Sequence, residues 1–439
     1  MSTAILRSLR VAAEATYGSV STSTGQPDSS GLSFYGAEFE RASLTVFGGE
    51  SEIVEDGTVA NGPGGLPPEV SASWTSTGSR VKRQTGDITL SMRVKGLGAG
   101  NALLADANDL PLALMLATGM KLTDHGGAAL TPTGMGANNG IVSFAAPPGF
   151  ADGELVMANI DGCLVSNRVV DVTGSDATFS HYWPRALTGA DSIQRGLNFA
   201  VGRNTDTGAV GDSVVIEARS KSASYEAFGC RFVSASFTNE NGMALVELTL
   251  RPAIIITTQG ATTPTTAARI DSPTAVLRGV ALYRTDGDTG IIGGASAPIS
   301  LAASKVPFEL DGLTITIENT LVPVGTGCPA IGMSDMEVAN TTVSMEYTSR
   351  APATADELDL LNRVCRGITL AAAPLSDGAN AYNGCAWNIP AASLSADPNV
   401  TAEDDGLLTQ TRSYAMRDYT GDALGESGVR NFVFYLGGT

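Results

Sequence analysis

The sequence predicts a mainly β protein that contains two tandem copies of one antiparallel domain, and three observations point to that fold class. Apolar and polar residues alternate with a period of two in several segments, the pattern of half-buried antiparallel strands. Glycine is abundant, with 51 residues in 439, and only 16% of residues are charged, which favours strands and turns over surface helices. Short landmarks also recur in the same order in the two halves of the chain, which indicates a duplication.

The clearest strands have one apolar and one polar face. Residues 88–94 and 246–250 carry Ile, Leu, Met or Val at every second position, with Thr, Ser, Arg or Glu between them. Residues 313–317 show the same alternation in the second half of the chain. The segment 432–436 is apolar at every position, so we expect it to be a central or interface strand.

Two helices are predicted. Residues 354–366 open with the capping box Thr354-x-x-Glu357 and are followed by a glycine that can end the helix. Residues from about Leu110 to Thr118 have a proline in the first turn and a glycine directly after the last. Each predicted helix follows one of two similar strands.

The evidence for duplication is the ordered recurrence of these landmarks. The strand sequence TLSM at 89–92 matches TVSM at 342–345, and GCRF at 229–232 matches GCAW at 384–387. Each GC segment opens a strand, a polar turn and a return strand. The Thr-, Ala- and Pro-rich stretch 257–269 reads as a linker. The sequence therefore divides into residues 1–256, a linker at 257–269, and residues 270–439.

The first copy contains a long stretch, residues 121–215, that has no counterpart in the second. It could form additional strands of the first domain, a loop that mediates stacking, or a decoration on the exterior. The sequence alone leaves these alternatives open.

The charge balance and the rare residue types argue against several classes of function. The chain has 27 basic and 45 acidic residues and a net charge of −18, so sequence-specific binding of nucleic acid is nearly excluded. Two histidines leave little material for a metal site or a catalytic triad. Five widely spaced cysteines without a CxxC motif suggest small buried side chains rather than disulfides or a zinc site, namely Cys163, Cys230, Cys328, Cys365 and Cys385.

Four motifs resemble functional sites without completing them. The segment GLGAGN at 96–101 lacks the final glycine and the βαβ context of a dinucleotide fingerprint. The segment DGDTG at 286–290 resembles a calcium loop, but Ala297 occupies the position of the bidentate glutamate. The acidic cluster from Glu403 to Asp405 reads as a solvated turn. An acid/base pair could combine candidates that the spacing does not bring together, namely Asp124, His125, Glu154 and Asp161.

We therefore predict no catalytic, cofactor-binding or metal-binding residues, no cofactor and no enzyme activity. The N-terminus carries no signal-peptide pattern, and the longest apolar run, 111–117, is too short to cross a bilayer. We expect a soluble chain that is made in a cytoplasm and has no membrane-spanning segment.

Several segments together resemble the major tail tube proteins of long-tailed, siphovirus-like bacteriophages. They are AEATYG at 13–18, the segment 225–252, the run 308–347 and the strand, turn and strand of 377–418. The resemblance covers about two-thirds of the chain and lies in the pattern rather than in invariant residues.

The resemblance implies two fused tail-tube domains, each a β-sandwich or barrel with one packed helix, together with an N-terminal arm and long loops. It implies a virion protein that assembles in the host cytoplasm into trimeric, pseudo-hexameric rings or into hexameric rings. These rings stack into a tube, the conduit through which double-stranded DNA is ejected without specific binding. The implied partners are the tape measure protein, the tail terminator and baseplate proteins.

Acidic side chains that face the lumen would repel DNA phosphates. We expect some of these acids on the polar faces of strands or turns, and the candidates are Glu247, Glu318, Glu346 and Glu403 to Asp405.

Two alternatives remain open at the level of sequence. The chain could be another tube-fold virion component, such as a terminal ring or a baseplate hub. It could also be an adhesive β-sandwich that binds carbohydrate, with Trp74, Trp183 and Trp387 as platforms for sugar stacking.

Overall fold

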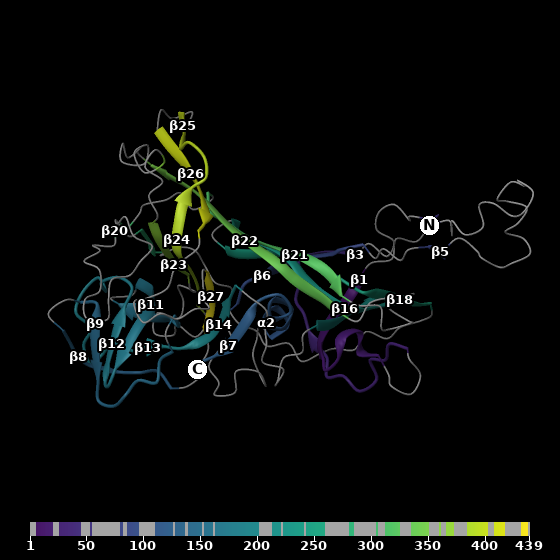
Figure 1. The fold of residues 1–439 in the computed structure, drawn as a ribbon, viewed down its shortest axis with the longest axis horizontal. Helices are drawn as coiled ribbons and strands as arrows, with labels where there is room; N and C mark the ends of the chain where they lie inside the picture. Colours follow the sequence, from purple (N-terminus) through teal and green to yellow (C-terminus); the bar gives the residue numbers. More distant parts are fainter. Residues whose placement is uncertain are drawn as a thin grey trace, which may run out of the picture.

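A computed structural model gives the fold (Figure 1), and strands dominate it. It describes residues 6–20, 26–44, 53–54, 80–81, 86–95, 110–125, 128–136, 139–151, 153–160, 163–201, 213–220, 223–240, 243–259, 281–284, 304–305, 312–324, 335–350, 360, 366–372, 384–402, 408–417 and 432–437. The predicted fold class, a mainly β protein with large antiparallel sheets and a packed helix, is confirmed.

Eight antiparallel strands form one continuous sheet, which we call the long sheet. Its strands lie in the order β3 (Arg41–Leu44), β6 (Ile88–Arg93), β17 (Met243–Arg251), β16 (Ala223–Glu240), β21 (Thr314–Val324), β22 (Asp335–Arg350), β26 (Leu408–Met416) and β24 (Cys385–Leu394). The short strand β25 (Asn399–Ala402) pairs with β26 and forms the hairpin at the top of Figure 1. Both halves of the chain therefore contribute four strands each to the long sheet.

Two further sheets pack against the long sheet, and each uses the first part of a strand that later enters it. In the first half of the chain the order is β2 (Tyr35–Gly36), β1 (Leu6–Glu14), β15 (Ser213–Ser220), β16 and β18 (Ile254–Gln259). In the second half the order is β20 (Ser304–Lys305), β19 (Ala281–Arg284), β23 (Arg366–Ala372), β24 and β27 (Val433–Gly437), continued by β14 (Gly196–Ala200) and β7 (Lys121–Asp124).

The two halves thus use the same strand order. Seven strands of the first half correspond one to one with seven strands of the second half, both in their neighbours and in their order along the chain. The first set is β1, β3, β6, β15, β16, β17 and β18, and the second set, in the same order, is β19, β21, β22, β23, β24, β26 and β27. The long strands β16 and β24 each have an irregular register where they pass from one sheet to the other. In β24 the interruption includes Pro390, which has no backbone N–H to donate to a sheet.

The predicted strands are confirmed. Burial alternates along 88–93, as the period of two requires, and 246–250 and 313–317 also turn their apolar side chains inward. The segment 432–436 is wholly buried, and β27 is a central strand that pairs with β14 on one side and with β24 on the other.

Helix α2 (Leu110–Ala117) confirms the helix predicted at 110–118. All eight of its residues are buried, which is expected for a helix that is apolar on every side. It packs against β1, β15 and β16 within the main hydrophobic core. The predicted helix at 354–366 lies almost wholly outside the described residues, although Leu360 is described and packs against the core. Its expected end is wrong, because Arg366 already begins strand β23.

The expected linker is described only at its start. Strand β18 extends through residues 257–259, and residues 260–269 lie outside the described part of the chain. Two short strands, β4 (Ile53–Val54) and β5 (Arg80–Val81), pair with each other, and the 3-10 turn η1 (Tyr17–Ser19) follows β1.

The stretch 121–215 contains a separate small barrel, which we call the inserted barrel (residues 128–194). Its strands follow the order β13 (Ile193–Gln194), β10 (Leu155–Ile160), β11 (Cys163–Thr173), β12 (Asp176–Phe179), β9 (Ile141–Phe144) and β8 (Pro132–Met135). Leu130 and Ile193 exchange two backbone hydrogen bonds of 2.9 and 2.8 Å, which join β13 to the chain just before β8. The inserted barrel has its own core, in which Phe144, Phe150, Phe179 and Trp183 form a chain of edge-to-face contacts.

The inserted barrel packs on the second half of the chain, although it is inserted in the first (Figure 1). Leu155 and Met157 of β10 form a buried cluster with residues of β14, β23, β24 and β27, namely Ala200, Ala371, Ala386, Val433 and Tyr435. In the first half, the corresponding outer face of β15, β16 and β18 is covered instead by Tyr17, Val20, Leu32 and Phe34.

Candidate functional site

The most extensive polar feature of the described residues is one face of the long sheet, which we call the hydroxyl face. Its members are mainly serine and threonine on adjacent strands, and all are partly or fully exposed. They are Thr89, Ser91, Arg93, Ser234, Ser236, Thr238, Glu247, Thr249, Thr314, Thr316, Glu318, Thr342, Ser344, Glu346 and Ser413.

The opposite face of the same strands is buried. Side chains alternate between the two faces of a strand, so each hydroxyl residue is flanked by core residues. Leu90, Leu248 and Ala235 lie in one such row, and Ile317 and Val343 continue it into the second half of the chain. Because these core residues fix which side of every strand is buried, they also keep all side chains of the hydroxyl face on the same side of the sheet.

The charge of the hydroxyl face is negative. Glu247, Glu318 and Glu346 are exposed on β17, β21 and β22, where the sequence placed them on polar strand faces. Arg93 is also on this face, but its Nε lies 2.6 Å from Oε1 of Glu40, which compensates its charge. The other candidate acids, Glu403 to Asp405, lie outside the described residues.

The two halves of the long sheet meet between β16 and β21. Five successive residue pairs form this junction, from Ser234 opposite Glu318 to Thr238 opposite Thr314. The side chain of Asn319 donates a 2.9 Å hydrogen bond to the carbonyl of Gly119, at the end of helix α2. A β-carbon at Gly119 would lie 2.6 Å from the Asn319 amide nitrogen, so this close approach requires glycine.

A buried charged pair adds to the junction. The guanidinium of Arg231 on β16 forms a salt bridge with Asp335 at the start of β22 and donates a 3.2 Å hydrogen bond to the carbonyl of Thr118. The arginine side chain is 2% exposed, so loss of Asp335 would leave a buried cation without its carboxylate. Helix α2, β16 and β22 are thereby held together by polar contacts as well as by the core.

Both ends of the long sheet are edges within the described residues. β3 pairs with β6 on one side, and no described strand pairs with its other side. At the opposite end, Ser393 and Leu394 of β24 pair with β26, whereas the pairing between β24 and β23 reaches only Ala392. Open edges present unpaired backbone groups that can accept another strand.

A buried carboxyl group lies at the end of β1, in the sheet that β1 forms with β15 and β16. Glu14 accepts hydrogen bonds from the backbone N–H groups of Gly18 at 3.2 Å and Gly229 at 3.0 Å, and from the hydroxyl of Ser213. Burial raises the pKa of Glu14 from 4.5 to about 6, and these hydrogen bonds offset part of the rise. Gly229 has φ +65°, which allows its N–H to point at the carboxyl group.

The structure does bring His125 and Glu154 together, although sequence spacing gave no reason to pair them. His125 Nδ1 lies 3.5 Å from Glu154 Oε2, and Arg195 holds the same carboxylate with Nε–Oε1 and Nη2–Oε2 distances of 2.7 and 2.9 Å. Glu154 is fully buried. His125 and Arg195 flank the points where the chain leaves and re-enters the main sheets, so this cluster fastens the base of the inserted barrel. Asp124 ends β7, and Asp161 lies outside the described residues.

Two of the three tryptophans considered for sugar stacking are buried. Trp183 is 1% exposed in the core of the inserted barrel, and Trp387 is 3% exposed in the main core. Neither can present its ring to a carbohydrate, so the expectation that they form surface platforms is wrong. Trp74 lies outside the described residues.

The remaining motifs give no assembled site in the described part of the chain. Cys230 and Cys385 are buried, and neither takes part in a disulfide. The described residues contain no group of three or more His, Cys, Asp or Glu side chains arranged to hold a metal ion. The segments 96–101 and 286–290 and Ala297 lie outside the described residues.

Comparison with known proteins gives no family assignment. The sequence matches no protein-family model, and no curated protein is detectably similar to it. Among the described helices, none is both long and apolar enough to cross a membrane.

Proposed function

We propose that this chain is a structural virion protein, the major tail tube subunit of a long-tailed bacteriophage. Its copies assemble into rings that stack into a tube, and double-stranded DNA passes through the lumen of that tube during ejection. The role is assembly rather than catalysis, and the partners are further copies of the chain, the tape measure protein, the tail terminator and baseplate proteins.

The observation that carries the proposal is the long sheet. Both halves of the chain contribute four strands to it in the same order, one face is buried and the other is the hydroxyl face. Both ends are edges within the described residues. A sheet that is already continuous across two similar units can be extended by further units, and closure into a ring removes its edges.

The chemistry of the hydroxyl face fits the wall of a DNA channel. Serine and threonine hydroxyls are neutral, and the exposed glutamates Glu247, Glu318 and Glu346 repel phosphate. A surface that retained DNA would need clustered Lys and Arg instead. The net charge of −18 for the whole chain acts in the same direction.

Electron microscopy of the concentrated protein, and of particles that carry it, tests the proposal. Rotational averages of end-on views should show stacked rings, with threefold symmetry and six similar lobes if the two halves are equivalent. Sixfold rings would keep the tube but contradict the duplication as the basis of ring closure. Single rings that never stack would favour a terminal ring or baseplate hub, and no rings in any preparation would contradict the proposal.

A charge-reversal pair tests the role of the hydroxyl face. Tubes carrying Glu318→Lys should bind double-stranded DNA in a gel-shift assay, whereas tubes carrying Asp176→Lys should not. Both residues are exposed, but Asp176 lies on strand β12 of the inserted barrel rather than on the long sheet. Equal DNA binding by both variants would mean that the hydroxyl face does not line the lumen.

A further inference from the structure

We infer that neighbouring copies of this chain join through antiparallel pairing between β3 of one copy and the end of β24 of the next. The register repeats the one in which β21 pairs with β16 inside a single chain. This inference rests on the proposed function, because the pairing is the contact that would close the ring.

One row of residues crosses all eight strands of the long sheet, and each member lies directly opposite the next. In order, the row is Arg41, Ser91, Glu247, Ser236, Thr316, Ser344, Ala415 and Ser393. The first four residues lie on β3, β6, β17 and β16, and the last four on their counterparts β21, β22, β26 and β24. The row therefore has a period of four strands.

The sequence supports this correspondence residue by residue. Ser91 and Ser344 occupy the same place in the matching segments TLSM and TVSM. Ser236 and Ser393 occupy the same place in Ala-Ser-Phe and Ala-Ser-Leu, a match that emerges only when the strand pairing aligns β16 with β24. Equivalent serines thus occupy the second and the fourth strand of each four-strand unit.

The four-strand period predicts which strand should pair with the open side of β24. The strand next to β16 is β21, with Thr316 opposite Ser236. The counterpart of β21 is β3 and the counterpart of Thr316 is Arg41, so Arg41 should lie opposite Ser393. Within one chain β3 is at the other end of the long sheet, so a second copy must supply it. A contact between two different surfaces closes into a ring or continues as a filament.

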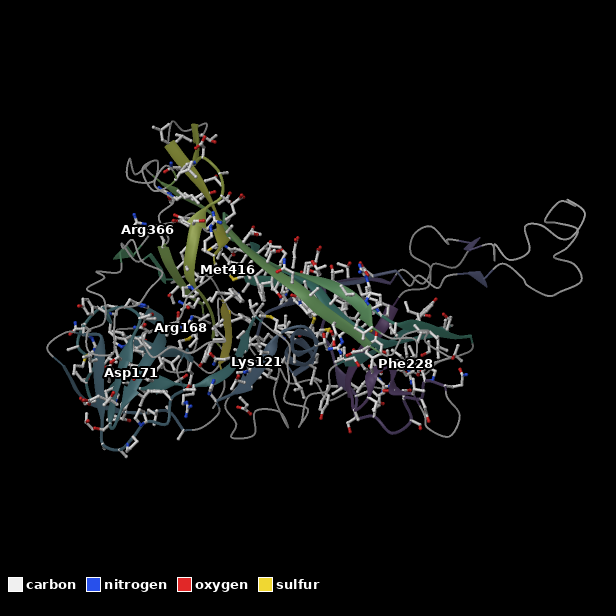
Figure 2. All side chains as sticks on the ribbon, in the orientation of Figure 1. Lys121, Arg168, Asp171, Phe228, Arg366 and Met416 are labelled. Atoms are coloured by element: carbon white, nitrogen blue, oxygen red, sulfur yellow. The ribbon has the colours of Figure 1, made fainter. Side chains whose placement is uncertain are left out.

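Within the described residues no strand pairs with the second side of β3 or with the second side of Ser393 and Leu394. Both of these β24 side chains are buried, and the hydroxyl of Ser393 accepts a 2.6 Å hydrogen bond from Nε of Arg417. Ala392 is opposite Arg366 on one side and opposite Met416 on the other, and both partners are labelled in Figure 2. Beyond Ala392, β24 continues through Ser393 and Leu394 with β26 alone. The free side of β3 supplies the matching partner.

Disulfide cross-linking of the double variant Arg41→Cys/Ser393→Cys in the assembled full-length protein tests the contact. Directly opposite residues in antiparallel strands have Cα atoms about 4.5–5.5 Å apart, which is within reach of a disulfide. On a non-reducing gel the variant should shift from the mass of one chain, 44.9 kDa, to multiples of it. A ladder that ends at three chains would give the copy number of a closed ring.

Three controls make the result specific. The variant Ser236→Cys/Thr316→Cys joins the equivalent positions within one chain and should form a disulfide without any increase in mass. The variant Arg41→Cys/Ser395→Cys is displaced by two residues to a diagonal pair about 7–8 Å apart, where disulfides form poorly. The unsubstituted protein, oxidised in parallel, reports any cross-links through its own five cysteines.

The outcomes separate this inference from the proposed function. Tubes that form without the cross-link, or that cross-link equally in the displaced variant, would overturn the contact and leave the tube proposal standing. Cross-linked closed species without tubes would support the contact and contradict the tube. A protein that neither assembles nor cross-links would contradict both.

Discussion

Replacement of Glu14 by glutamine should remove a pH-dependent part of the unfolding free energy. Burial raises the pKa of this carboxyl group from 4.5 to about 6. A group whose pKa is higher in the folded state contributes its full stability below about pH 4.5 and loses it as the pH rises through about 6. The rise in pKa corresponds to about 2 kcal/mol between those limits.

The assay compares urea unfolding of the unsubstituted protein and Glu14→Gln across this pH range. Glutamine keeps one oxygen that can accept hydrogen bonds from the N–H groups of Gly18 and Gly229. Any loss of hydrogen bonding in the variant therefore changes its unfolding free energy by the same amount at every pH. The difference between the two unfolding free energies should change by about 2 kcal/mol from about pH 4 to about pH 7.5, in favour of the variant at the higher pH.

Glu226→Gln is the matched control. Burial also raises the pKa of Glu226, but this side chain is only about half buried, so its substitution should produce a smaller pH dependence. The difference in unfolding free energy between Glu14→Gln and the unsubstituted protein could instead be the same at both ends of the pH range. That result would show that burial does not raise the pKa of Glu14.

Three further substitutions test the packing. Gly229→Ala should lower the unfolding free energy measured by urea denaturation by about 1–3 kcal/mol, because φ at Gly229 is +65° and the added β-carbon would lie 2.8 Å from that of Ala253. Its control, Gly134→Ala, adds a β-carbon in open space and should be nearly neutral. Trp183→Ala should cost about 3–5 kcal/mol and Trp183→Phe less, since Phe keeps a ring beside Phe179; equal losses by calorimetry would contradict this packing. Glu154→Gln should weaken the base of the inserted barrel by about 3–5 kcal/mol, because Arg195 loses its buried carboxylate. Faster hydrogen exchange in β10 would report that loss, and the exposed Asp176→Asn should leave exchange unchanged.

Local pattern was sufficient to predict the strands of the long sheet and helix α2. A strand with one buried face must alternate, so 88–94, 246–250 and 313–317 carry their structure in their own sequence. The same alternation placed Glu247, Glu318 and Glu346 on polar faces. Alternation cannot identify the partner of each strand, and the hydroxyl face exists only because the pairing aligns these polar faces across six strands.

The inserted barrel was not predictable from periodicity. Strand β10 is buried at five of its six positions, because one face lies in the core of the inserted barrel and the other packs on the second half of the chain. A strand that is buried on both faces shows no alternation in its sequence, only a continuous apolar run. The cluster of His125, Glu154 and Arg195 was not predictable for a related reason, since a fold-dependent contact brings residues together from three separate segments.

The pairing of β14 with β27 bears on how the chain is made. On the ribosome, β14 and the apolar side of the inserted barrel emerge long before residues 433–437, which complete their environment. Until then Leu155 and Met157 lack Val433 and Tyr435, the largest side chains that cover them, and exposed apolar surface promotes aggregation during synthesis. Contacts between the middle of the chain and its end also slow folding. Strand β14 and the apolar side of the inserted barrel therefore complete their contacts only when β27 has been synthesised, whereas the other first-half strands pair within their own half.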